Sequence, residues 1–172
     1  MSYAGIDVGT TNCKITVLSE DGSVIFRDSR SYDLILPAPS RAELSPTQVW
    51  EAFLEIVRKA TNATNKTDPI EAISFSVLGE AVTPIDNKGQ PLSNTLVSMD
   101  SRGEKEIEEI VEYKIDPYQI YLRTGQVCHP MYTASKLLWW KNRTPEIYKN
   151  TWKFLCWEDF LLFKLCGRPV IS

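Results

Sequence analysis

The first part of the chain alternates apolar and polar positions in three short runs, which is the pattern of half-buried β-strands. The runs cover residues 3–8, 13–19 and 24–32, and turn-forming segments at 9–12 and 20–23 separate them. The second turn contains an Asp-Gly pair, which is typical of a tight hairpin. The pattern therefore predicts that the chain opens as an antiparallel three-stranded meander.

The next pattern has helical spacing. Ser45 is a favourable N-cap, Pro46 suits the first helical position, and Gln48 completes a capping box. Apolar residues then recur every three to four positions. We expect this helix to run to about Thr61 and to end in the polar segment 62–68.

Further strands and helices are expected in the rest of the chain. The apolar patterns predict strands at 70–77 and 82–85, a short apolar run at 96–99, and helices at 104–113, 131–142 and 152–165, with Gly167 as the last helix stop. A meander, a helix, a strand and then helices imply an α/β domain with one mixed sheet. Residues 167–172 predict a turn entering a strand, so we expect a domain that is cut at Ser172 and incomplete.

The composition indicates one ordinary globular domain. The chain has 172 residues, 43% of them apolar, with a net charge of −3 and no basic stripe, so neither a nucleic-acid partner nor a membrane partner is expected. The start shows no signal-peptide pattern, and the segment 160–166 is far too short to cross a bilayer. Cys13, Cys128, Cys156 and Cys166 match no metal-binding spacing. We expect reduced thiols and a cytoplasmic location.

The first turn has two interpretations. In the local one, Asp7 bonds to nearby backbone and Gly9 supplies a positive φ angle. In the functional one, Asp7 ends a strand that otherwise looks buried, where a carboxylate is costly unless it is paired, and Mg²⁺ is a natural partner. The backbone N–H groups of the turn and the Thr10 and Thr11 hydroxyls would then form an anion-binding concavity, and Lys14 could reach phosphate oxygens. Phosphoryl transfer requires such positioning and charge neutralisation.

The segment Asp7-Val8-Gly9-Thr10-Thr11-Asn12-Cys13-Lys14 resembles the first phosphate motif of the actin-like ATPase superfamily and, more narrowly, that of the FGGY carbohydrate kinases. Similar segments follow in the family's order over nearly the whole chain: Glu43-Leu44-Ser45-Pro46, Asp100-Ser101-Arg102, Thr124-Gly125, His129-Pro130-Met131-Tyr132, Ser135-Lys136-Leu137-Leu138-Trp139, Pro145-Glu146-Ile147 and Trp157-Glu158-Asp159-Phe160-Leu161.

The resemblance implies an actin-like, ribonuclease H-like domain over residues 1–172. In this family an N-terminal domain of this kind faces a C-terminal nucleotide-binding domain across a cleft, and the catalytic base would lie beyond Ser172. ATP and Mg²⁺ are the implied cofactors, with Gly9, Thr10, Thr11, Asn12 and Lys14 on the nucleotide side and Asp7 on the metal. The implied reaction transfers the γ-phosphate to a hydroxyl of a sugar, sugar acid or polyol.

The resemblance also shapes what we expect of the chain by itself. Residues 1–172 would contain neither the catalytic base nor the C-terminal domain, so we expect no phosphorylation by them alone. The full-length form could be a homodimer. The alternatives are a non-catalytic actin-like module that binds nucleotide or sugar, and a truncated, vestigial kinase.

Substrate-side candidates follow the later strands. Glu80 comes after the strand 70–77, where ligands gather in open α/β sheets, and its carboxylate can accept bonds from sugar hydroxyls. At the place that resembles Gly79-Glu80, glycerol kinases carry Arg-Glu and xylulokinases carry Met-His. Gly79 departs from the first pattern and the missing histidine from the second, which argues against glycerol and xylulose as substrates. The alternative is a solvated loop acid.

Two further pairs complete the candidates. Asp100 and Arg102 could bind hydroxyls or, in an aldonate, a carboxylate; the alternative is a local ion pair that shapes the turn. His129, the only histidine, and Tyr132 are candidate sugar contacts, although a lone histidine is more often structural. The tryptophans are expected mainly in the core.

Overall fold

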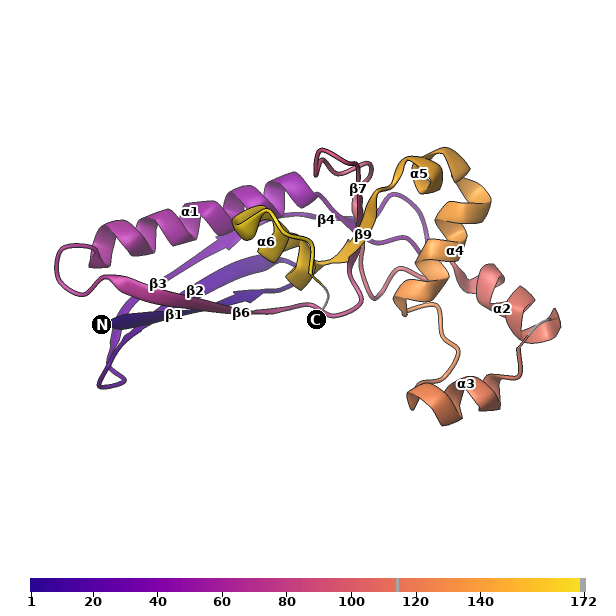
Figure 1. Cartoon of the computed structure of the whole chain (residues 1–172), viewed down its shortest axis with the longest axis horizontal. Helices are drawn as coiled ribbons and strands as arrows, with labels where there is room; N and C mark the ends of the chain where they lie inside the picture. Colours follow the sequence, from indigo (N-terminus) through magenta and orange to yellow (C-terminus); the bar gives the residue numbers. More distant parts are fainter. Residues whose placement is uncertain (114, 171–172) are drawn as a thin grey trace.

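The chain folds into an elongated α/β structure with its long helix over a sheet at one end and a group of helices at the other (Figure 1). The structure is a computed structural model and describes residues 1–113 and 115–170. Within these residues, no helix combines the length and apolarity that a bilayer crossing requires.

The first sheet is built on the predicted meander. Strands β1 (Ser2–Val8), β2 (Asn12–Ser19) and β3 (Val24–Ser31) pair antiparallel in sequence order, which confirms the prediction. The predicted strand 70–77 is also confirmed as β6 (Ile70–Val77), which pairs parallel to β1. The sheet order is β3-β2-β1-β6. All of these strands except β6 come from one continuous stretch of chain.

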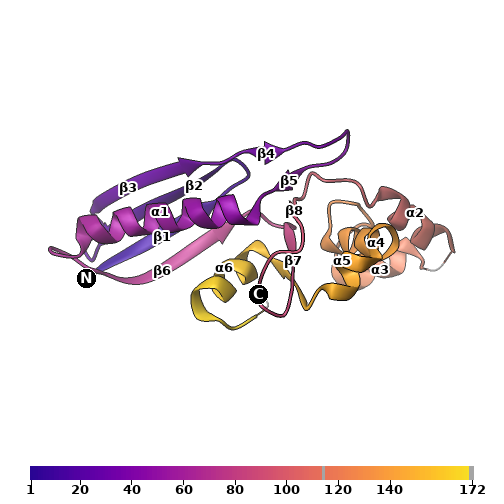
Figure 2. The ribbon, with the colours of Figure 1, turned by 90° about the horizontal axis from the view of Figure 1, so that it is seen from above.

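The core lies on one face of this sheet. Alternate residues of β1 and β2 point into it, among them Ile6, Val8 and Ile15. Helices α1 (Pro46–Thr64) and α6 (Trp157–Cys166) contribute to the same core, and Figure 2 shows both from above. The opposite face of the sheet is exposed in the described structure. It carries mostly polar and small side chains, and the exposed pair Tyr3 and Leu18 lies at one end of it.

Helix α1 begins as predicted. The Gln48 amide donates to the Ser45 hydroxyl at 3.3 Å, and Pro46 occupies the first turn. The helix ends at Thr64, three residues later than predicted, because Ala60 and Thr64 are buried and continue the apolar stripe. The polar residues Thr61 and Asn62 lie on the exposed side and therefore do not end the helix.

The first sheet is the mixed sheet that we expected, and a second sheet that we did not predict accompanies it. Its five short strands all pair antiparallel: β4 (Leu34–Ile35), β5 (Glu43–Leu44), β8 (Thr95–Leu96), β7 (Val82–Ile85) and β9 (Lys153–Cys156). The prediction of a helix from 152 was wrong for β9. The apolar residues of β9 fit both a helical and a strand spacing, and the segment forms a strand because it pairs with β7.

The remaining helices form the other end of the molecule (Figure 1): α2 (Glu104–Tyr113), α3 (Pro117–Thr124), α4 (Thr133–Arg143) and α5 (Pro145–Asn150). The helices predicted at 104–113 and 131–142 are confirmed as α2 and α4, whereas α3 and α5 were not predicted. Helix α3 carries clear signals, since Asp116 caps its start and Gly125 ends it at φ 71°.

Gly167 ends α6 in the left-handed region at φ 69°, as predicted. The strand start expected after it does not appear at residues 168–170, which have no regular structure. The expectation that a strand begins near Ser172 therefore stays a prediction, because only residues 168–170 of this segment are described. Ile171 and Ser172 themselves lie outside the described residues.

Candidate functional site

The carboxyl ends of two adjacent parallel strands bring the first turn and the Glu80 segment to one edge of the sheet. Val8 of β1 is paired with Val77 of β6, and the Leu78 amide donates to the Val8 carbonyl at 3.0 Å. The turn 9–12 and the segment 78–80 therefore leave the sheet side by side. In open α/β sheets this edge is where ligands bind.

The turn itself is closed by its own backbone. The Gly9 amide donates to the Asn12 carbonyl at 2.9 Å. Gly9 is not among the glycines with positive φ, so the interpretation that it supplies a left-handed angle was wrong. No described residue accepts a hydrogen bond from the amides of Thr10 and Thr11. These two donors are therefore available to an anion.

Asp7 lies on the exposed face of the first sheet, next to the turn. We expected a buried carboxylate, and this was wrong: Ile6 and Val8 point into the core, so the residue between them points to the other face. Asp7 is paired across the sheet with Lys14 on one side and Ser76 on the other. These side chains line a shallow depression of about 420 Å³.

This arrangement can be tested for its fit to Mg²⁺. No group of three or more His, Cys, Asp or Glu side chains in the described chain could hold a metal ion. Mg²⁺ usually keeps several waters and takes one or two carboxylates together with substrate phosphates. A single exposed Asp7 beside the amides of the turn fits that mode of binding and does not fit an all-protein metal cage.

Glu80 has an unusual backbone and a defined partner. Its φ is 56°, a left-handed conformation that costs a non-glycine residue about 1–2 kcal/mol. Its Oε2 accepts hydrogen bonds from the Thr133 amide at 2.6 Å and from the Thr133 hydroxyl at 2.8 Å. Thr133 begins α4, whose N-cap residue gives no side-chain bond, so Glu80 caps this helix from a distance. Oε1 accepts no bond from a described residue and is available to a hydroxyl.

Asp100 and Arg102 are bonded to each other and buried. Asp100 is 0% exposed, and its Oδ2 accepts from the Ala42 amide at 2.7 Å and from Arg102 at 2.8 Å. Arg102 also donates to Glu43 at 2.6 Å and stacks over the Trp139 ring at 4.8 Å. These contacts give the pair a structural role, and its contact with a sugar stays a prediction. Glu43 belongs to a quoted family segment, but no role was predicted for it.

Lys136 is a buried cation that no prediction singled out. It is 0% exposed, and its Nζ donates to the carbonyl oxygens of Pro130, at 3.4 Å, and Met131. Burial lowers the pKa of Lys136 to about 8, although the charges of Asp100 and Glu80 act in the opposite direction. The signal in the sequence was its place on the apolar side of α4, four residues before Trp140.

His129 and Tyr132 lie in the loop that Lys136 holds. His129 is exposed, and its Nδ1 accepts from the Met131 amide at 3.1 Å. Tyr132 is half-buried, and its amide donates to the His129 carbonyl at 3.3 Å. This loop leads directly to Thr133 and hence to Glu80. Both residues therefore lie on the segment that leads to Thr133, the hydrogen-bond partner of Glu80, and their contact with substrate stays a prediction.

The fold, with a polar turn between the first two strands of the meander and a parallel strand beside them, defines a domain of the actin-like ATPase class. A solved gluconate kinase from Lactobacillus acidophilus superposes with a TM-score of 0.87 at 28% identity, over 98% of this chain and 34% of that chain. A xylulose kinase from Rhodospirillum rubrum superposes with a TM-score of 0.94, over 100% of this chain and 36% of that one, and at 22% identity supports the fold alone.

Residues 2–171 match the family model described as "FGGY family of carbohydrate kinases, N-terminal domain", and the chain belongs to this family. A gluconokinase from Bacillus subtilis is 32% identical over 168 residues, which are 98% of this chain and 32% of the relative. A xylulose kinase from Staphylococcus xylosus is 30% identical over 98% of this chain and 35% of its own length. The chain thus spans about a third of the length of these relatives.

Proposed function

We propose that this domain supplies the sugar side and the first phosphate turn of an ATP-dependent carbohydrate kinase in carbohydrate metabolism. The reaction transfers the γ-phosphate of ATP to a hydroxyl of a sugar, sugar acid or polyol. The observation that carries the proposal is the hydrogen bond from Leu78 to Val8, because it brings the phosphate turn and the Glu80 segment to the same sheet edge.

The residues divide into two groups by chemistry. On the phosphate side, the amides and hydroxyls of Thr10 and Thr11 bind phosphate oxygens, with Gly9 and Asn12 shaping the turn and Lys14 adding positive charge. Asp7 would hold Mg²⁺ through water, and the ion would neutralise phosphate charge. We assign no catalytic base between Met1 and Ser172.

On the sugar side, Glu80 is the strongest candidate. Its Oε1 is available, while Thr133 fixes the other oxygen and so orients the carboxylate. The guanidinium of Arg102 is occupied by Asp100 and Glu43, so binding of an aldonate carboxylate there would require those bonds to break. A polyhydroxylated substrate that bonds to Glu80 through its hydroxyls fits this geometry without rearrangement.

We further propose that transfer requires a nucleotide-binding domain in addition to these 172 residues, because the chain spans about a third of its relatives. The test is release of ADP from ATP by the purified chain in the presence of gluconate, xylulose or glycerol. Release that depends on the sugar would refute this part of the proposal. No release, together with sugar binding, supports it.

Binding by the chain tests the site directly. Isothermal titration with the three sugars should show binding that Glu80→Ala weakens, whereas Glu71→Ala, at an exposed acid on the strand that precedes Glu80, should have no effect. In a polypeptide that catalyses transfer, Asp7→Ala should abolish activity and Glu80→Ala should mainly raise the sugar KM. Unchanged kinetics in both variants would refute the site. Nucleotide binding without any sugar binding would favour a non-catalytic module.

A further inference from the structure

Tyr32 contacts the phosphate turn at three carbonyl groups. Its hydroxyl oxygen lies 2.6 Å from the Gly9 carbonyl oxygen and 3.0 Å from that of Asn12. Its amide donates to the Thr11 carbonyl at 3.0 Å. One residue at the end of β3 therefore holds carbonyl oxygens from both ends and the middle of the turn.

These bonds set the direction of the amides in the turn. A peptide unit is planar and trans, so its carbonyl and its N–H point in opposite directions. Holding the Gly9 carbonyl toward Tyr32 therefore turns the Thr10 N–H away from Tyr32. The bond to the Thr11 carbonyl comes from the Tyr32 backbone amide and so does not depend on the side chain. The Thr10 N–H, a donor that would bind phosphate, faces away from Tyr32 because the Gly9 carbonyl is held toward the Tyr32 hydroxyl.

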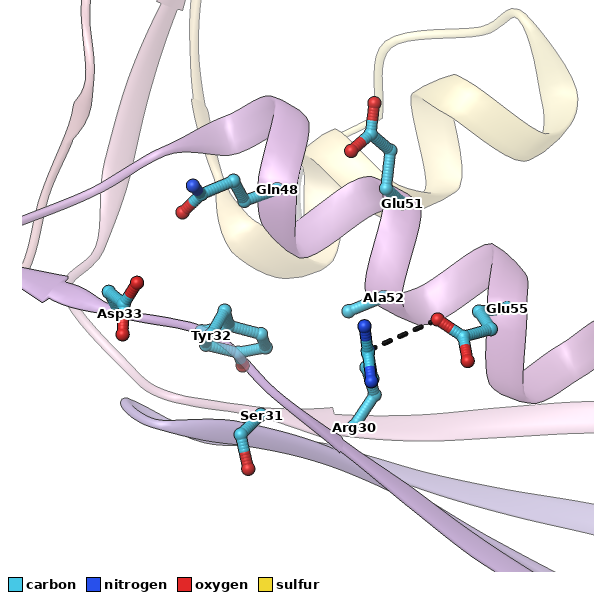
Figure 3. A pocket seen from close by; sticks show the side chains of 8 residues that line it. All are labelled: Arg30, Ser31, Tyr32, Asp33, Gln48, Glu51, Ala52 and Glu55. Atoms are coloured by element: carbon cyan, nitrogen blue, oxygen red, sulfur yellow. Dashed lines mark ion pairs between the residues drawn. The ribbon is translucent and has the colours of Figure 1, made fainter.

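The Tyr32 ring packs against the hydrophobic core and also borders a cavity. Figure 3 shows the ring at the wall of a cavity of about 250 Å³ between the end of β3 and α1. The other walls are polar side chains, including Gln48, Glu51 and the pair Arg30–Glu55 at 3.1 Å. The ring is therefore held by the core on one side and borders open space on the other, and its hydroxyl contacts with the turn hold its polar end.

We propose that Tyr32 is a positioning residue of the phosphate turn, whose hydroxyl orients the Thr10 amide toward the phosphates of the nucleotide. The inference rests on the proposed function for the identity of the ligand. Burial raises the pKa of Tyr32, so the hydroxyl keeps its proton and remains a donor at neutral pH.

The test is Tyr32→Phe in the 172-residue chain, with Tyr118→Phe, at an exposed tyrosine on α3, as the matched control. The probes are Mg·ATP and gluconate, measured separately by titration. We expect Tyr32→Phe to weaken Mg·ATP binding about tenfold, which corresponds to about 1.4 kcal/mol, the scale of one hydrogen bond. Gluconate binding should stay within about twofold of wild type. Unchanged nucleotide affinity, or an equal loss for both ligands, would overturn the inference.

A second readout needs no ligand and separates this inference from the proposed function. In ¹H–¹⁵N spectra, Tyr32→Phe should shift the Thr10 amide, and Tyr118→Phe should not. If wild type binds no Mg·ATP but the Thr10 amide shifts, the turn does not bind nucleotide within these residues alone, and the positioning role stands. Wild type can also be tested unaltered: a Tyr32 hydroxyl proton that exchanges with water as fast as that of Tyr118 would contradict the positioning role.

Discussion

Gly103 lies so close to the backbone of Ser135 that a Cβ atom at position 103 would come within 2.6 Å of the Ser135 carbonyl oxygen. This contact joins the segment that follows Arg102 to helix α4, which Glu80 caps. The segment after Asp100 and Arg102 and the helix that Glu80 caps therefore touch at a glycine, where a side chain would not fit.

Gly103→Ala should destabilise the chain because the neighbour is backbone, which cannot rotate away. Overpacking of this kind costs about 1–3 kcal/mol. Chemical denaturation would measure it, with Gly5→Ala as the control, since no atom lies within 4 Å of a Cβ at that position. Equal stability of the two variants would show that α4 can move away from Gly103 at little cost.

Asp100→Ala should be one of the most damaging substitutions in the chain. It leaves the Ala42 amide without its acceptor and Arg102 buried against Glu43 alone. Removing one partner of a buried ion pair costs about 3–5 kcal/mol. Asp33→Ala, at an exposed acid, should change the free energy of unfolding by less than about 0.5 kcal/mol. If Asp100→Ala unfolds at the same denaturant concentration as wild type, Asp100 is not a structural residue.

Lys136 should make stability depend on pH in the alkaline range. Its pKa is about 8 in the folded chain against an ordinary value of 10.5. Between these two values the unfolded chain binds the proton and the folded chain does not. The free energy of unfolding therefore gains a contribution that rises as pH rises from about 8 to 10.5.

Lys136→Met tests this dependence because it keeps much of the volume and removes the charge. Denaturation of wild type and variant should be compared at several pH values in this range, so that effects of other titrating groups cancel. The difference between the two curves should change in favour of wild type as pH increases. A constant difference would show that the ammonium is not destabilised by burial.

The four cysteines should react with a thiol reagent in an order set by burial. Cys166 is exposed, whereas Cys13 is buried. Burial raises the pKa of Cys13 to about 12, and the charge of Asp7 adds to this effect. Under native conditions iodoacetamide should modify Cys166 first and Cys13 last, which peptide mass mapping would show. Early modification of Cys13 would mean that β2 opens easily.

The elements that the sequence predicted correctly are those held by local contacts. The meander connects neighbouring strands, and α1 has its start signals within four residues of Ser45. The second sheet was missed because three of its five strands have two residues each and carry no period of their own. Their conformation is decided by partners far away in the chain.

The candidate site follows the same division. The turn 9–12 could be read from its residues, but the partners of the other candidates are remote: Glu80 meets Thr133, and Arg102 meets Glu43. The exposure of Asp7 could have been predicted, since Tyr3, Gly5 and Asp7 occupy alternate positions of one strand. The sequence pattern around Tyr32 gave no indication of its contacts with the turn.

The arrangement of the second sheet also implies an order of folding during synthesis. The first sheet needs only residues up to Val77, whereas Ile85 of β7 must wait for Lys153 of β9 to leave the ribosome. Domains fold as their N-terminal parts emerge, and non-local strand pairs form slowly. The turn 9–12 should therefore be in place while the second sheet is still unformed. Pulsed hydrogen exchange should show protection of β1 and β2 before β7.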